Sequence, residues 1–143
     1  VADRIAGLAL GHPRLESALS HPKIGPRLVR GSVGRRPAMA HLQAVAETFV
    51  ATAAEARTSF FTSMREMNLT EGLPSIEVPV TVVVGSHDRL LPPRYSKRIA
   101  SLIPNSQLVV LDEAGHMLPW EAPEKLVELL VAATDAEQVR RSA

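Results

Sequence analysis

The stretch "PVTVVVGSHDRLLPPRYSKRIASLIPNSQLVVL", residues 79–111, decides the fold of this 143-residue chain. It opens with a β-branched, apolar run that ends at Gly85, and it closes with a second apolar run at 107–111. Short runs of this kind, bounded by proline and glycine, are typical of strands buried on both faces. Between them, Pro93 suits the first turn of a helix, and apolar residues follow at helical spacing. Strand, helix and strand within about thirty residues predict the βαβ unit of a parallel sheet.

Two polar side chains that can carry chemistry follow the predicted strands. Asp88 lies in the loop after the first strand, and His116 lies in the loop after the second. Because both strands of a βαβ unit point the same way, the two loops leave the sheet along one edge, where open α/β sheets form their sites. A carboxylate there can fix the tautomer of a catalytic imidazole. The geometry equally suits a turn-capping Asp88 and a hydrogen-bonded loop histidine, so both interpretations stay open at this point.

The other titratable residues nearby have simpler interpretations. His87 adjoins Asp88, and because consecutive loop side chains diverge we expect it to be exposed. Asp112 and Glu113 are expected to form a turn, although either can substitute as the acid. The remaining histidines show no spacing typical of metal ligands: His12, His21 and His41. No phosphate-cradling glycine motif occurs, and we expect neither a cofactor nor a metal.

The N-terminal half has a different composition. Residues 11–37 hold much of the chain's proline and glycine, which predicts loop structure with room for short helical turns. This segment is basic, with no acid from Ser17 to Ala46, and it is either a solvated excursion or a contact for an anionic substrate or surface. Residues 38–68 have apolar residues at spacings of three and four and predict a helix, with a break near 58–59.

The C-terminal segment predicts one more helix. Pro123 suits its first turn, and four apolar residues are expected to face inward: Leu126, Val127, Leu130 and Val131.

Bulk composition excludes several classes of protein. Hydrophobic residues make up 45% of the chain and charged residues 22%, as in ordinary globular domains. The net charge is +1, which argues against a nucleic-acid partner. No apolar run approaches the roughly 18 residues of a membrane span, and there is no cysteine. We therefore expect a cytoplasmic protein, although the chain begins with Val rather than Met, so a signal can lie upstream.

Two stretches together resemble a known family. "VPVTVVVGSHDRLLPP" and "IPNSQLVVLDEAGHMLPWEAPEKL" resemble the C-terminal part of an α/β-hydrolase. The resemblance implies that Asp88 is the acid of the catalytic triad and that His116 is its base. "ADRIAGLAL" is similar to the sixth strand of the family, and residues 13–68 stand where the family inserts a helical cap.

The resemblance implies a partial α/β-hydrolase fold, with the last three strands of a parallel sheet, flanking helices and a cap insertion. The expected division is residues 1–12 for the end of a core segment with the sixth strand, 13–73 for the cap region and 74–143 for the C-terminal core.

The chain departs from the family at the nucleophile. The family's elbow is G-x-S-x-G, and no such pattern occurs. "GLALG" holds Ala9 at its centre, and "RGSVG", which contains Ser32, lies in the proline-rich segment and lacks the first glycine. The resemblance therefore places the nucleophile upstream of residue 1. We expect this chain alone to be inactive and to self-associate through an open, apolar sheet edge.

The implied activity is hydrolysis of an ester or a similar small apolar acyl substrate through a Ser-His-Asp triad. Two alternatives stay open. The nucleophile can be aspartate, as in dehalogenases and epoxide hydrolases, or the chain can be a truncated, non-catalytic α/β module that acts by binding.

Overall fold

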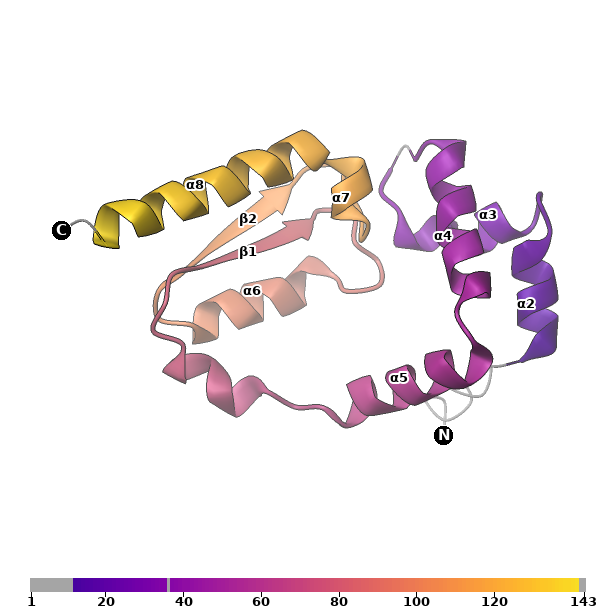
Figure 1. Ribbon diagram of the computed structural model, residues 1–143, viewed down its shortest axis with the longest axis horizontal. Coiled ribbons are helices and arrows are strands. Elements are labelled where there is room, and N and C mark those ends of the chain that lie inside the picture. The colour runs from indigo at the N-terminus through magenta and orange to yellow at the C-terminus, as the bar shows by residue number, and fades with distance from the viewer. Residues whose placement is uncertain (1–11, 36, 142–143) are drawn as a thin grey trace. The chain divides into compact units, whose positions relative to one another are not determined.

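The computed structural model describes residues 12–35 and 37–141 (Figure 1). The described residues form two compact units, which we call the helical unit (residues 12–30 and 37–71) and the sheet unit (residues 31–35 and 72–141). The elements are α2 (Pro13–Ser20), α3 (Gly25–Leu28), η1 (Val29–Ser32), α4 (Met39–Ala51), α5 (Ala54–Glu66), η2 (Thr70–Ser75), β1 (Val80–Gly85), α6 (Pro93–Leu102), β2 (Ser106–Leu111), α7 (Leu118–Glu121) and α8 (Pro123–Arg141). The three-part division into core segment, cap and C-terminal core stays a prediction.

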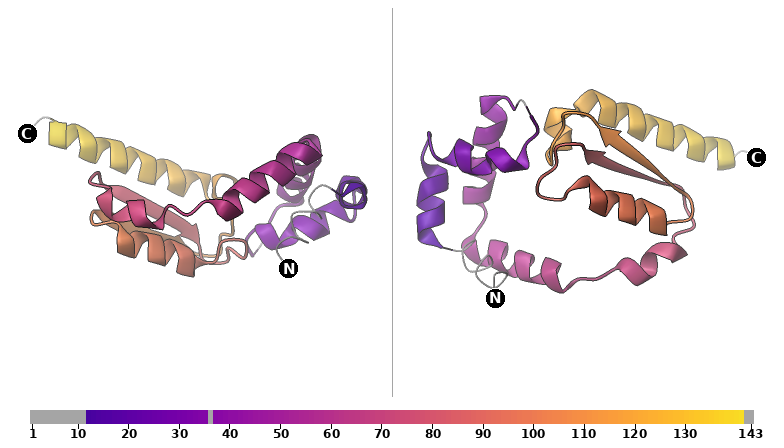
Figure 2. Two further views of the ribbon diagram at one scale, coloured as in Figure 1. Left: turned by 90° about the horizontal axis from the view of Figure 1, so that it is seen from below. Right: turned by 180° about the vertical axis from the view of Figure 1, so that it is seen from behind.

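The predicted βαβ unit is confirmed. β1 and β2 are parallel, and their register runs from Val80 opposite Ser106 to Gly85 opposite Leu111. α6 begins at Pro93, as predicted, and packs on one side of the two strands, while α8 runs along the other side (Figures 1 and 2). Because the two strands end opposite each other, the loops that follow them leave the sheet at the same edge. The expected strand at residues 5–10 lies outside the described residues.

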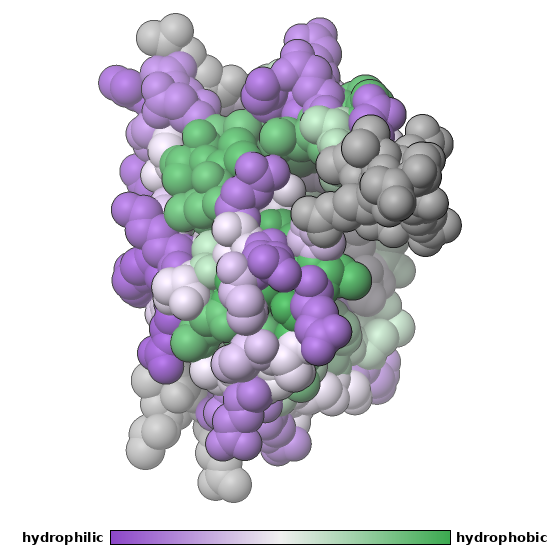
Figure 3. All heavy atoms as spheres, turned by 90° about the vertical axis from the view of Figure 1, so that its left-hand side faces the viewer, coloured by the Kyte–Doolittle hydropathy of each residue, from purple (hydrophilic) through white to green (hydrophobic). Residues whose placement is uncertain are grey.

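The inward face predicted for the last helix is confirmed for Leu126 and Leu130, which line a cavity beside the strands, and is not confirmed for Val127 and Val131. α8 does begin at Pro123, but Val127, Leu130 and Val131 are exposed. A cavity of about 550 Å³ lies between this helix and the strands, with Thr81 and Val83 on the strand side. Each described strand has 6 residues and is about 20 Å long, whereas the helix has 19 residues and is about 28 Å long, so part of the helix extends past the strands. Apolar surface, in green, is correspondingly visible on the face shown in Figure 3.

The helical unit is more helical than the composition predicts, because α2, α3 and η1 all fall within residues 11–37. The break in the long helix is real, but it comes at Thr52 and Ala53, not at 58–59. Arg57 explains the shift, since its guanidinium donates to the carbonyls of Phe49 and Thr52 and so caps the end of α4.

Arg57 also joins α5 to α2. Its side chain, only 5% exposed, makes an ion pair with Glu16 at 2.7 Å and lies 4.7 Å from the ring centre of Phe49. The apolar core of this unit includes Leu19, Leu42 and Ala46. Several residues of the predicted apolar helix face are instead exposed: Met39, Phe60, Met64 and Met67.

Candidate active site

The site lies in the sheet unit, where two loops leave the carboxyl ends of the strands. We call them the Asp88 loop (residues 86–92) and the His116 loop (residues 112–117). The amide of Ser86 donates to the carbonyl of Leu111 at 2.8 Å, and the amide of His87 donates to the carbonyl of Ala114 at the same distance. These two backbone bonds extend the pairing of the strands into the loops, so the loops stay in contact after the sheet ends.

The two predicted site residues meet across these loops. Nδ1 of His116 lies 2.9 Å from Oδ2 of Asp88. The Asp88 side chain is 7% exposed and the His116 side chain 34%, so the carboxylate is buried while part of the ring is open. An ionised carboxylate can only accept, so Nδ1 must carry the hydrogen of this bond. In the neutral ring, Nε2 is then the acceptor.

The second oxygen of Asp88 is held by its own loop. Oδ1 accepts from the amides of Leu90, at 2.9 Å, and Leu91, at 2.8 Å. These are the bonds of a turn-capping aspartate, which was the simpler interpretation of this residue. The two interpretations are compatible, because the two oxygens of the carboxylate have different partners. One oxygen orders the loop, and the other receives the hydrogen from the imidazole.

Two glycines allow close backbone contacts around the site: Gly85 where the two loops meet, and Gly115 where the His116 loop meets the segment that contains Gly34. A Cβ on Gly85 would lie 2.3 Å from the carbonyl oxygen of Ala114, and a Cβ on Gly115 would lie 2.3 Å from the amide nitrogen of Gly34. Both contacts are with backbone atoms, which cannot move aside as a flexible side chain does. Glycine is therefore required beside both site residues for steric reasons.

The neighbouring acids and histidine take structural roles. Oδ1 of Asp112 lies 3.1 Å from the hydroxyl of Ser86, and that hydroxyl also accepts from the amide of Glu113 at 2.9 Å. Glu113 has a φ of 58°, the left-handed conformation of a tight turn. His87 is half-buried rather than exposed, with Nδ1 3.0 Å from the Ser86 hydroxyl. The predicted turn at residues 112 and 113 is confirmed, and neither acid takes the place of Asp88 beside the imidazole.

Sequence reasoning missed one residue of this region, Glu121. Its carboxylate accepts from the amides of Gly115, at 2.9 Å, Met117, at 3.0 Å, and Gly34, at 2.5 Å. The short helix α7 brings the side chain of Glu121 back to the His116 loop. The amide of Arg35 adds a bond of 3.0 Å to the carbonyl of Glu113. A glutamate that accepts from backbone amides has no sequence signal of its own.

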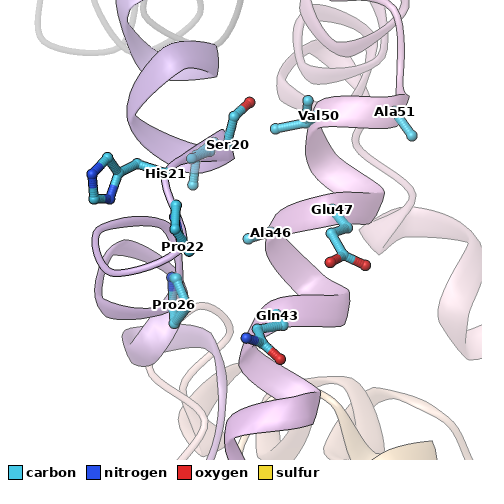
Figure 4. A pocket seen from close by; sticks show the side chains of 10 residues that line it. Ser20, His21, Pro22, Pro26, Gln43, Ala46, Glu47, Val50 and Ala51 are labelled. Carbon is cyan, nitrogen blue, oxygen red and sulfur yellow. The ribbon is translucent and has the colours of Figure 1, made fainter.

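The helical unit contains a cavity of about 370 Å³ (Figure 4). Pro22 and Pro26 lie on one side, and Ala46 and Val50 of α4 lie on the other, while the ring of His21 points away from α4. The side chains that line the cavity do not form an acid–base pair, so it ranks below the Asp88–His116 site. Among residues 12–35 and 37–141, no cluster of three or more acids and histidines suits a metal ion.

None of the helices that the structure describes is both long enough and apolar enough to cross a membrane.

Comparison with known proteins gives three relatives of interest. A family described as alpha/beta hydrolase fold matches residues 6–123. The chain is 36% identical over 58 residues to the uncharacterized hydrolase YugF of Bacillus subtilis, covering 41% of this chain and 21% of YugF. It is 34% identical over 64 residues to monoacylglycerol lipase ABHD6 of Mus musculus (45% of this chain, 19% of the relative). It is 38% identical over 66 residues to epoxide hydrolase EphH of Mycobacterium tuberculosis (43% and 31%). The matches thus span less than a third of each relative.

Two solved structures share the arrangement of elements. An esterase from Exiguobacterium antarcticum matches with a TM-score of 0.67 and 22% identity, over 83% of this chain and 46% of that one. MenH from S. aureus matches with a TM-score of 0.71 and 17% identity, over 96% of this chain and 51% of that one. The chain spans about half the length of these structures.

Proposed function

Because the chain belongs to the α/β-hydrolase fold family, we propose that it supplies the acid and the base of a catalytic triad, Asp88 and His116. The observation that carries the proposal is the 2.9 Å contact between the buried carboxylate of Asp88 and the partly exposed ring of His116. The position of the Asp88–His116 pair also supports the proposal, because both residues follow parallel strands at the edge where such sheets form their sites. The parent protein is a hydrolase of an ester or a similar small apolar acyl compound.

In the proposed mechanism, His116 moves the protons and Asp88 holds the ring. Nε2 of His116 takes the proton of a serine hydroxyl as its oxygen attacks the ester carbonyl. The Asp88 carboxylate keeps Nδ1–H in place and stabilises the imidazolium that forms. The imidazolium then returns the proton to the departing alcohol oxygen. In the second half, His116 takes a proton from water, the resulting hydroxide attacks the acyl-serine, and the serine regains its proton.

The nucleophile and the oxyanion donors belong, in this proposal, to a part of the fold outside residues 1–143. Two observations support this. The chain has no G-x-S-x-G motif, and it spans only about half of the solved structures that it resembles. In the family fold, the oxyanion donors include the residue after the nucleophile. Residues 1–143 alone are therefore expected to leave an ester substrate intact.

Aspartate is the alternative nucleophile, and the similarity of this chain to an epoxide hydrolase supports that alternative. An aspartate would attack a carbon atom of the substrate and form an alkyl ester while the carbon–halogen bond or the carbon–oxygen bond of the epoxide breaks. His116 would then take a proton from the water that cleaves this ester. The Asp88–His116 pair suits both reactions. The remaining alternative, a binding module without catalysis, draws on the exposed apolar residues of the sheet unit, such as Val78 and Leu130.

A fluorophosphonate probe tests the proposal. It should be applied both to residues 1–143 and to the protein expressed with the coding sequence upstream of Val1, and the intact masses compared. We expect no adduct on the shorter chain and one adduct, upstream of Val1, on the longer protein. No adduct on either, together with turnover of an epoxide or haloalkane, would favour the aspartate alternative. An adduct within residues 1–143 would contradict the proposal, and no adduct and no turnover would favour the binding module.

A further inference from the structure

Glu121 holds the backbone on both sides of His116. Oε2 accepts from the amide of Gly115, which precedes the histidine, at 2.9 Å. Oε1 accepts from the amide of Met117, which follows it, at 3.0 Å. The two bonds therefore fix the peptide units that flank the residue whose ring faces Asp88.

The same carboxylate also joins this backbone to a distant segment. Oε2 accepts from the amide of Gly34 at 2.5 Å, and the two residues are 87 positions apart in the chain. The three accepted bonds use three of the roughly four acceptor positions that a carboxylate has. Hydrogen bonds to a charged group contribute more to stability than hydrogen bonds between neutral groups.

From this geometry we propose that Glu121 is a positioning residue for His116, whose carboxylate sets the orientation of the imidazole through the backbone at Gly115 and Met117. Its importance for catalysis rests on the proposed function, whereas its effect on the ring does not. The backbone before His116 passes through a glycine, the residue with the most conformational freedom, so it needs an external restraint to hold one conformation. Glu121 provides that restraint from the end of α7, one helical turn away.

Glu121→Gln isolates the charge and the acceptor capacity while keeping the shape. A glutamine at this position can offer its oxygen to Gly115 and Gly34, but its NH₂ group then faces the amide of Met117, donor against donor. The matched control is Glu124→Gln, which removes an exposed carboxylate three residues away in the first turn of α8.

The first readout is the proton NMR signal of the His116 Nδ1–H, measured in the full 143-residue chain. His116→Gln assigns the signal, because that variant lacks it. We expect the signal to be sharp in the unchanged chain and in Glu124→Gln, and to broaden or vanish in Glu121→Gln while the thermal midpoint stays close to that of the control. An unchanged Nδ1–H signal in Glu121→Gln would overturn the inference, and it would do so whether or not His116 is catalytic.

The second readout is turnover in a protein that includes the nucleophile. We expect Glu121→Gln to lower kcat by up to about 100-fold with little change in KM, because a displaced base affects the chemical step more than substrate binding. Loss of the NMR signal with unchanged kcat would leave the positioning role in place and remove the proposed function. A change in KM alone would contradict positioning of the base.

A measurement on the unchanged chain covers the case in which Glu121→Gln does not fold. The Glu121 carboxylate accepts from the amides of Gly115 and Met117, so the protons of these two amides should exchange slowly with deuterium in the solvent. Fast exchange of both amides would show that the carboxylate does not hold this backbone, and would overturn the inference.

Discussion

The Asp88 loop and the His116 loop follow neighbouring strands at the same edge of the sheet, yet they are ordered by different means. Asp88 orders its own loop, because its Oδ1 accepts from the amides of Leu90 and Leu91, two and three residues further along. The His116 loop depends on residues outside it, namely Glu121 and the segment that contains Gly34. The turn that follows Asp88 is thus held by the aspartate itself, whereas the backbone on both sides of His116 is held by a residue outside its loop.

This difference suits the roles proposed for the two residues. The carboxylate is buried, and the proposed mechanism requires it to keep one position, so a rigid local turn is sufficient. The imidazole must face Asp88 with one nitrogen and a reacting oxygen with the other, and its angle depends on the whole loop. Contacts from several directions fix such an angle better than one turn does.

Asp88→Asn should have the largest effect. Oδ1 of the asparagine can still accept from Leu90 and Leu91, so the loop keeps its shape, but the NH₂ group replaces the acceptor that faces Nδ1 of His116. The ring then carries its hydrogen on Nε2 and cannot take a proton, which lowers kcat by about 10³–10⁴-fold in a protein that includes the nucleophile. Turnover measured beside Asp112→Asn checks this, because Asp112 is one of the two other candidate acids. Equal losses in both variants would mean that the acid is misassigned.

Gly85→Ala should break the contact between the loops without touching a polar side chain. The new Cβ would lie 2.3 Å from the carbonyl oxygen of Ala114 and 2.4 Å from that of Gly115, so the loops must separate. We expect a loss of about 1–3 kcal/mol in the free energy of unfolding, as for other overpacked sites. Urea unfolding measures it, with Gly72→Ala as the control, since a Cβ there has no neighbour within 4 Å. Similar stabilities for the two variants would show that the loops adapt more easily than the contacts imply.

The sequence was sufficient for the parts of the molecule that depend on neighbouring residues. β1, α6 and β2 follow from apolar runs and from Pro93, and parallel pairing follows from the single helix between the strands. That pairing brings Asp88 and His116 to one edge, so the sequence was sufficient to predict that these two candidate residues meet.

The features that the sequence did not predict depend on side-chain contacts that leave no periodic pattern. The helix break at Thr52 is fixed by Arg57, which reaches back eight and five residues to bond two carbonyls. Glu121 bonds Gly34, 87 residues away, and a carboxylate that accepts from amides leaves no periodic pattern. The burial of the apolar residues of α8 was not predictable for a related reason. Periodicity shows which residues share one face of a helix, but it does not show which surface covers that face.

Glu113→Gly should have the smallest effect on stability, and it tests what holds the turn at residue 113 of the His116 loop. Glu113 has a φ of 58°, a conformation that costs a residue with a Cβ about 1–2 kcal/mol, whereas glycine adopts it freely. The substitution also removes the ion pair with Arg35, but that contact is 3.4 Å long and both side chains are largely exposed, so it contributes about 0–1 kcal/mol. The backbone bonds of residue 113 to Arg35 and Ser86 remain possible. Relief of strain then outweighs both the lost ion pair and the greater freedom of glycine in the unfolded chain. We expect the free energy of unfolding, measured in urea, to rise by up to about 0.5 kcal/mol.

Arg35→Gln separates the two contributions, since it removes the ion pair and leaves the strain. A loss of stability in Glu113→Gly equal to that in Arg35→Gln would mean that the ion pair, and not the backbone, holds this turn to the segment that contains Gly34.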